Sequence, residues 1–233
     1  IKALSEAMNT PETTRSPLTV HPDSPWLAPL AGFSDLPFRL LCREQGAAVA
    51  CTEMVSAKGL IYGLKQKEQS GGTEDLLLTT PEDDPLVVQL FGEDPEFLAM
   101  AVDVLKQRGY RYFDLNMGCS VPKVCRSGAG AALLRDPGQA VAVAEAMIKA
   151  AGPGLAGCKI RLGWDAGSRV SLELGTELAD PGAAGPPLHP RYAPRRFRGP
   201  AGLVHPVNRV RPLCSPLLPR RGPFQAGESS TLL

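Results

Sequence analysis

The sequence predicts an α/β fold, an incomplete (β/α)8 TIM barrel in which about five to six strand–helix units are recognisable. Three observations predict it. Short apolar segments alternate with longer helical patterns from Trp26 onward. The helices share one kind of start and stop signal. Polar residues stand in or at the ends of otherwise apolar strands, as expected where the strands of a barrel meet at one mouth.

Five segments have the composition of buried strands. They are nearly continuous apolar runs rather than alternating ones, which is typical of parallel strands covered on both faces. The expected strands are residues 26–31, 48–54, 86–91, 112–117 and 158–162.

Three helices lie between these strands, and each begins after an aspartate that can cap it and ends at a glycine. Two of them also carry proline at the first helical position, where its missing N–H costs nothing. The caps are Asp35, Asp94 and Asp136, and the glycines that close the same helices are Gly46, Gly109 and Gly152.

An alternation of strands and helices fits either a doubly wound sheet or a barrel. The polar residues favour the barrel, because its strand ends converge on one mouth. These residues are Pro29, Glu53, Gln89, Asn116 and Lys159. A dinucleotide-binding sheet would place G-x-G-x-x-G after its first strand, where this chain has AGFSD instead.

The chain divides into three parts. Residues 1–25 are polar and rich in Pro, Thr and Ser, so we expect a flexible lead-in. Residues 26–180 contain the barrel portion. Residues 181–233 have eight arginines, one acidic residue and frequent prolines, which exclude a central strand. We expect this last part to be disordered, and we find no sixth, seventh or eighth strand in it.

Composition limits the classes of function. The net charge of +1 gives no general basicity, although a local basic patch would be compatible with it. The six cysteines form no C-x-x-C pair and have no metal-like spacing with histidine, so we expect reduced thiols and no metal. No apolar run of about 18 residues and no secretory leader is visible. We therefore expect a cytoplasmic protein with no membrane segment.

Six short motifs follow one another along the barrel portion. They are Ala28–Arg39 (APLAGFSDLPFR), Thr52–Lys58 (TEMVSAK), Val88–Gly92 (VQLFG), Asp114–Cys119 (DLNMGC), Gly128–Pro137 (GAGAALLRDP) and Lys159–Gly163 (KIRLG). In order and spacing they resemble the bacterial tRNA-dihydrouridine synthases over about residues 26–180. The resemblance implies an FMN-binding barrel followed by a small helical domain. It also implies NADPH-dependent reduction of the 5,6 double bond of uridines in tRNA.

The resemblance assigns roles to residues at the strand ends. Cys119 matches the catalytic cysteine; an ordinary thiol, with a pKa of about 8.5, is largely protonated at neutral pH and can donate a proton. The family usually has proline after this cysteine, where Ser120 stands here. Asn116 has an amide that can donate to a carbonyl of uracil and accept from its imide N–H.

The resemblance also implies a set of flavin contacts. Gln89 and Lys159 match family positions beside the isoalloxazine, where a fixed cation stabilises the reduced flavin. The other expected cofactor-binding residues are Pro29, Leu30 and Ala31 in the first loop, and His189 near the FMN phosphate. Pro186 and Pro187 precede His189 and oppose a strand there.

Four cations are candidates for contact with the substrate. Arg161 lies on the same face as Lys159 by the two-residue period of a strand, and reaches flavin or substrate. Lys123, Arg126 and Lys58 are candidates for RNA phosphate contact, with ordinary solvated charge as the alternative.

Two other interpretations remain open from the sequence. The chain is another FMN barrel reductase that acts on a free pyrimidine, or it is a non-catalytic, truncated or frameshifted member of the family. The abrupt change of composition after about residue 180 motivates the second interpretation.

Overall fold

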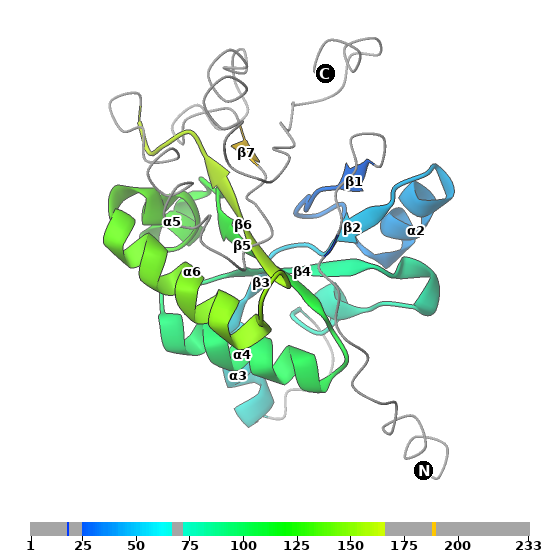
Figure 1. Ribbon diagram of the computed structural model, residues 1–233, viewed down its shortest axis with the longest axis horizontal. Coiled ribbons are helices and arrows are strands. Elements are labelled where there is room, and N and C mark those ends of the chain that lie inside the picture. Colours follow the sequence, from blue (N-terminus) through cyan, green and yellow to red (C-terminus); the bar gives the residue numbers. More distant parts are fainter. Residues whose placement is uncertain (1–17, 19–24, 67–71, 166–187, 190–233) are drawn as a thin grey trace.

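The computed structural model describes residue 18 and residues 25–66, 72–165 and 188–189. These residues form an incomplete parallel β/α barrel, as the sequence predicts (Figure 1). The sheet has the strand order β1-β2-β4-β5-β6-β7, and β3 also pairs with β4. The strands are β1 (Trp26–Leu27), β2 (Val49–Cys51), β3 (Val55–Ser56), β4 (Leu86–Phe91), β5 (Tyr112–Met117), β6 (Ala156–Arg161) and β7 (Leu188–His189).

Helices follow the strands as in a barrel. They are α2 (Leu36–Glu44), α3 (Ala57–Gln66), α4 (Pro95–Gln107), α5 (Pro122–Arg126) and α6 (Pro137–Ala151), with short 3₁₀ segments η1 (Asp75–Leu77), η2 (Pro81–Asp83) and η3 (Gly130–Arg135). Figure 1 shows α3, α4 and α6 side by side on one face of the sheet, with α2 beyond β2. The predicted caps are confirmed, since Asp35, Asp94 and Asp136 each accept a hydrogen bond from an amide of the first turn.

The strands β4, β5 and β6 separate apolar from polar residues by their two-residue period. One face packs against the helices and carries Val88, Leu90, Phe113, Leu115 and Ile160, all at most 2% exposed. From the helix side, α4 and α6 add small and branched residues, including Ala101, Val102, Ala140 and Val143. The opposite face of the same strands is the inner wall of the barrel.

Two predicted strands are shorter or more broken than expected. The segment 26–31 is a strand only at Trp26–Leu27. Pro29 lacks an N–H for the ladder, and Leu30 begins a turn in which its carbonyl accepts from Phe33 at 2.9 Å. The segment 48–54 is a strand only at Val49–Cys51, and β3 follows it at Val55–Ser56. Between the two strands, the Thr52 hydroxyl accepts the amide N–H of Gln89 at 3.1 Å where a strand would offer a carbonyl.

The expectation that no sixth barrel strand exists is wrong at one point. Leu188 and His189 pair in parallel with Ile160 and Arg161. Two residues suffice for this pairing, so Pro186 and Pro187 do not prevent it. Apart from Leu18, Pro25 and this short strand, the predicted lead-in and tail lie outside the described residues.

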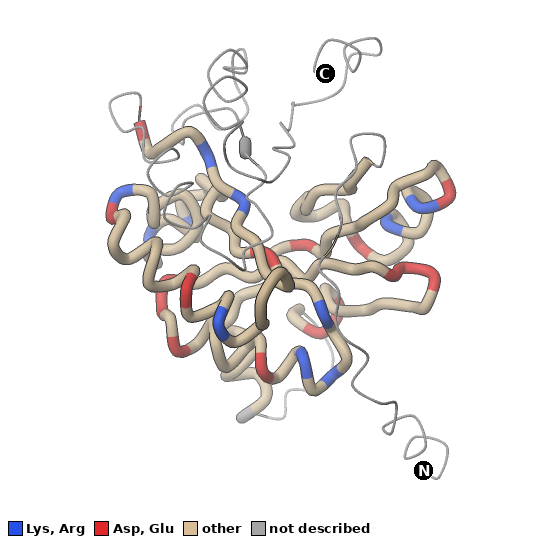
Figure 2. Tube along the Cα trace, in the orientation of Figure 1, with Lys and Arg blue, Asp and Glu red and all other residues tan. Residues whose placement is uncertain are grey.

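No helix in the described part of the chain is both long and apolar enough to span a membrane. Basic and acidic residues are intermixed over the described trace, as Figure 2 shows.

Candidate active site

Five polar side chains lie together on the inner wall of the barrel, toward the carboxyl ends of β4, β5 and β6. The strand register explains their proximity, since Gln89 pairs with Asp114 and Asn116 pairs with Lys159. Arg161 follows Lys159 by two residues and therefore shares its face. All five are buried, with exposed fractions of 1% to 8%.

Hydrogen bonds connect three of these side chains in a line. The Gln89 amide donates through Nε2 to Oδ2 of Asp114 at 2.5 Å. Its oxygen accepts from Nδ2 of Asn116 at 2.9 Å. The oxygen of Asn116 in turn accepts the backbone N–H groups of Gly118 at 3.0 Å and Cys119 at 2.8 Å. The line therefore runs from a buried carboxyl to the loop that bears the cysteine.

Asn116 was expected both to donate to a carbonyl of uracil and to accept from its imide N–H, and its hydrogen bonds leave only the first of these. An amide oxygen has two lone pairs, and both are used by the amides of Gly118 and Cys119. Asn116 therefore cannot accept from an imide N–H of a ligand. Its Nδ2, which otherwise lies 3.7 Å from the Met54 sulfur, is left to donate to a carbonyl.

Asp114 is a buried carboxyl that the sequence interpretation did not single out. Burial raises its pKa to about 7, while the hydrogen bond from Gln89 and the positive charge of Lys159 act in the opposite direction. The two-residue period could have revealed it, because Asp114 and Asn116 must share one face of β5. Cys158, which pairs with Leu115 on the next strand, faces the helices, and burial raises the pKa of that thiol as well.

The loop after β5 holds Cys119 half-buried at the mouth. Its carbonyl accepts from the Ala131 amide at 2.9 Å and from the Cys125 thiol at 3.4 Å. Arg161 donates through Nε to the carbonyl of Gly118, and its Nη2 lies 3.5 Å from the Ser120 hydroxyl. Ser120, which stands where the resemblance predicts proline, therefore supplies a side-chain partner for the guanidinium.

Gly130 has no room for a side chain, because it packs against the back of Cys119. A Cβ there would lie 2.7 Å from the Cys119 carbonyl oxygen and 2.9 Å from Val124, and its φ is +63°. We expect Gly130→Ala to lower the free energy of unfolding by more than the ~1–2 kcal/mol that a left-handed backbone conformation alone costs. Urea unfolding measures this.

The matched control for Gly130 is Gly63→Ala in α3. A Cβ at Gly63 meets nothing within 4 Å, so alanine there should stabilise the helix by about 0.5–1 kcal/mol. Equal unfolding midpoints for the two variants would contradict the packing of Gly130 against the cysteine loop.

The first loop presents backbone at the mouth of the barrel. Leu30 to Phe33 form a tight turn in which Gly32 has a φ of +79°, a value typical of the third position of a type II turn. The Glu53 carboxylate accepts the Gly32 amide at 2.5 Å, and the Ser34 hydroxyl accepts that of Leu30 at 3.0 Å. Ala31 is exposed at this turn, while Pro29 and Leu30 are half-buried.

The four predicted substrate cations differ in their surroundings. Arg161 is 2% exposed and holds the cysteine loop. Lys123 and Arg126 are exposed on α5, directly after that loop. Lys58 makes an ion pair with Glu93 and lies 3.8 Å from a carboxylate oxygen of Asp94, so it is already neutralised by protein groups.

The backbone of His189 lies beside Arg161 through the β6–β7 pairing. This places the residue at the carboxyl end of β6, on the same side of the molecule as the polar row. Within the described residues, no group of three or more His, Cys, Asp or Glu side chains could hold a metal ion.

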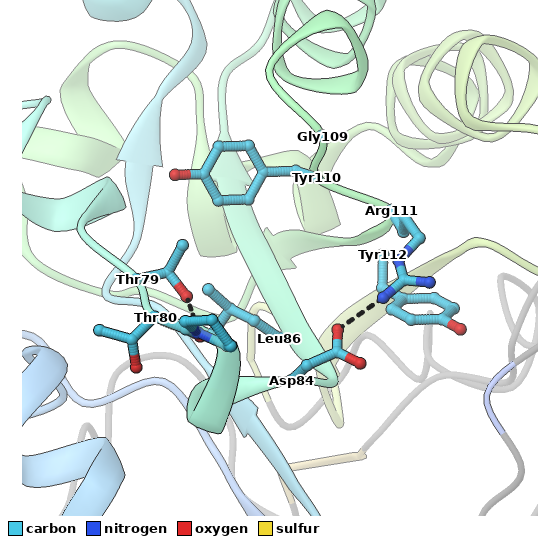
Figure 3. Close-up of a pocket in the computed structure, with 9 residues that line it drawn as sticks. Thr79, Thr80, Asp84, Leu86, Gly109, Tyr110, Arg111 and Tyr112 are labelled. Carbon is cyan, nitrogen blue, oxygen red and sulfur yellow. Dashed lines mark hydrogen bonds and ion pairs between the residues drawn. The ribbon is translucent and has the colours of Figure 1, made fainter. Parts of the chain in front are cut away.

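A separate hollow of about 510 Å³ lies at the opposite ends of the strands. Leu86 and Tyr112, which begin β4 and β5, line it together with Asp84 and Arg111 (Figure 3). The two charged groups in it face one another and form an ion pair at 2.8 Å, half-exposed to solvent. Barrel enzymes carry their active sites at the carboxyl ends of the strands, so we place the site at the polar row.

The comparison with known families decides the assignment. The family model described as dihydrouridine synthase (Dus) matches residues 26–212. The chain belongs to the dihydrouridine synthase family. Its match to the family begins where the predicted lead-in ends and extends beyond residue 180, where the predicted barrel portion ends.

Relatives within the family have similar names. The chain is 34% identical to tRNA-dihydrouridine synthase B of Xanthomonas campestris over 179 residues, covering 75% of this chain and 51% of the relative. It is 34% identical to tRNA-dihydrouridine synthase B of Pseudomonas aeruginosa, with the same two coverages. A probable tRNA-dihydrouridine synthase 1 of Synechocystis is 35% identical, covering 74% of this chain and 46% of the relative. The chain thus spans about half the length of these relatives.

Proposed function

We propose that this chain carries much of the catalytic half of an FMN- and NADPH-dependent tRNA-dihydrouridine synthase. The supporting observation is the convergence of Cys119 with the buried row of Gln89, Asn116, Lys159 and Arg161 at the carboxyl ends of β4–β6. Family membership and the names of the relatives agree with this function.

The donor set fits the pyrimidine edge of a flavin. That edge has two carbonyl oxygens, and the wall offers the second amide N–H of Gln89 beside the buried cations Lys159 and Arg161. Pro29, Leu30 and Ala31 would lie against the ring system, where the anchored turn offers backbone and small side chains. His189 would lie toward the phosphate.

FMN, reduced by NADPH, supplies the hydride for one carbon of the uracil 5,6 double bond. The residues of the chain supply position, charge and a proton. Lys159 places a fixed positive charge where negative charge develops in the cofactor. Asn116 donates to a uracil carbonyl and orients the base. Cys119 donates a proton to the second carbon and is recharged from solvent, so that NADPH, a proton and uridine become NADP⁺ and dihydrouridine.

The substrate is proposed to be tRNA. Lys123 and Arg126 are exposed immediately beside the cysteine loop, where phosphates of a bound RNA would pass, and contact with phosphate needs positive charge without fixed geometry. All five described cysteines are free thiols, which fits a reducing cytoplasm.

Flavin binding tests this function most directly. We expect the purified chain to bind FMN and quench its fluorescence, and expect Lys159→Met to weaken binding by about tenfold or more through loss of a charged hydrogen-bond donor. Lys149→Met is the matched control, because Lys149 is exposed on the outer helix α6.

The two variants separate a specific site from general electrostatics. Equal weakening by Lys159→Met and Lys149→Met would count against the proposed cofactor site. A wild-type chain that neither retains FMN nor binds it on addition would overturn the proposal, as would a flavin-loaded chain that NADPH reduces but tRNA never reoxidises.

A further inference from the structure

In the line of hydrogen bonds from Asp114 to the cysteine loop, only one assignment of donors and acceptors is possible. We call this assignment the direction of the line. Backbone N–H groups can only donate, so the amides of Gly118 and Cys119 require the oxygen of Asn116 to face them. The nitrogen of Asn116 is then turned toward Gln89 and needs an acceptor there. The oxygen of Gln89 fills that need at 2.9 Å, which leaves the Gln89 nitrogen facing Asp114.

Asp114 is the group that completes the line at its other end. The Gln89 nitrogen donates to it at 2.5 Å inside the sheet, where Gln89 is 1% and Asp114 6% exposed. A carboxyl offers an acceptor oxygen whether ionised or neutral, so the direction of the line does not depend on its proton. An apolar residue at this position would leave a buried N–H without a partner, which is costly.

This direction determines what the inner wall presents to a ligand. Both lone pairs of the Asn116 oxygen are used within the line, whereas the Gln89 oxygen accepts one hydrogen bond there, from Asn116. The second N–H of the Gln89 amide has no hydrogen-bond partner among the described residues, and the second N–H of Asn116 has only the distant Met54 sulfur. Both amides therefore offer a donor, and of their two oxygens only that of Gln89 keeps a lone pair for a ligand.

We propose that Asp114 is a positioning residue that fixes the orientation of the Gln89 and Asn116 amides, and through them the backbone of the Cys119 loop. It leaves one N–H of each amide for a ligand, which suits carbonyl oxygens or ring nitrogens. It acts through other residues and does not itself touch the reacting atoms. Its catalytic consequence rests on the proposed function, whereas the positioning itself is a property of the chain alone.

Amide hydrogen exchange in the full chain tests the positioning without any ligand. Selective ¹⁵N labelling of glycine and cysteine reports Gly118 and Cys119 at the end of the line. Gly152 at the end of α6, whose amide donates to the Ile148 carbonyl at 2.9 Å, and Cys42 within α2 serve as internal references, because neither adjoins the line. We expect Asp114→Leu to accelerate exchange at Gly118 and Cys119 about ten- to hundredfold relative to Gly152 and Cys42.

Two further variants separate positioning from general loss of stability. Asp114→Asn keeps an acceptor oxygen and should restore most of the protection. Phe113→Leu removes buried volume from the other face of the same strand, where Phe113 is 2% exposed. It should accelerate exchange at all four amides alike. If Asp114→Leu does not fold, Gln89→Met is the alternative, because it removes the acceptor of the Asn116 amide. It is expected to give the same selective acceleration at Gly118 and Cys119.

The outcomes are distinct. Unchanged exchange at Gly118 and Cys119 in Asp114→Leu, or equal acceleration at all four amides in Asp114→Leu and Phe113→Leu, would overturn the positioning role. Failure of the wild-type chain to bind FMN would count against the proposed function and would leave the exchange result as it stands.

Discussion

Replacing Cys119 by alanine is expected to lower the rate of uridine reduction in tRNA by about 10²- to 10⁴-fold, the usual contribution of a positioned general acid. Reduction of bound flavin by NADPH should remain, because it needs no proton from the thiol. Alanine retains the Cβ that packs beside Gly130 and leaves the backbone bonds to Asn116 and Ala131 intact. The loss would therefore report the thiol and not the loop.

The two half-reactions are measured separately by stopped-flow absorbance, with NADPH against oxidised flavin and with tRNA against reduced flavin. Cys125→Ala is the matched control. Its thiol is in the same segment and donates to the Cys119 carbonyl at 3.4 Å, but alanine there should keep most of the activity. If both half-reactions fail in Cys119→Ala, or if Cys125→Ala loses as much activity, Cys119 is not the acid.

The strands and helices that were predicted well have strong local signals. β4 and β5 match the predicted limits, because each is a largely apolar run between turn residues, interrupted only by Gln89 in β4 and by Asp114 and Asn116 in β5. The capped helices begin where predicted, because a single aspartate accepts the first free amides of each helix. These features depend on residues that are close together in the sequence, so they can be predicted from it.

The elements that were missed depend on partners far along the chain. α3 carries Gly59 and Gly63 and begins at Ala57, directly after a strand. Neither its composition nor a capping residue therefore indicates a helix there. β3 is separated from β2 at Thr52, whose hydroxyl accepts from Gln89 of β4, and β7 exists because two residues reach the edge of β6. Hydrophobic periodicity contains none of this information.

The candidate site also combines features that local sequence predicts with features that depend on distant partners. Its residues were found through a motif resemblance, and their burial agrees with roles on an inner wall. The direction of the amides was not accessible, because it follows from which donors and acceptors meet across β4 and β5. The same information makes Asp114 significant and removes the acceptor role expected of Asn116.

Replacing Asp83 by asparagine is expected to lower the free energy of unfolding by about 3–5 kcal/mol, the typical cost of breaking a buried ion pair from one side. Arg39 is 1% and Asp83 0% exposed in their side chains, and their charged atoms lie 2.9 Å apart. A second guanidinium, that of Arg43, lies 3.8 Å from the other oxygen of Asp83. Burial lowers the pKa of Arg43 and Asp83 opposes that effect, so loss of the carboxylate leaves two cations without their counter-charge.

Urea unfolding followed by far-ultraviolet circular dichroism measures the loss. Glu74→Gln is the control, because it breaks the Arg108–Glu74 pair at 2.8 Å, whose side chains are 30% and 51% exposed. Such a pair contributes about 0–1 kcal/mol. Asp83→Glu, which keeps the charge but is one methylene longer, should fall between the two. Comparable effects of Asp83→Asn and Glu74→Gln would show that the Arg39–Asp83 pair is not buried as described.

The Arg39–Asp83 ion pair also holds the first loop in place at the mouth of the barrel. Arg39 donates to the carbonyl of Ser34 at 2.8 Å and to that of Leu78, so one guanidinium joins the first loop, α2 and the segment before β4. Ser34 in turn anchors the Leu30 amide. We therefore expect Asp83→Asn to accelerate amide exchange in residues 30–34 more than in α6, even at denaturant concentrations where the rest of the barrel stays folded. A uniform acceleration would instead mean that the pair stabilises the fold without positioning the loop proposed to hold the flavin.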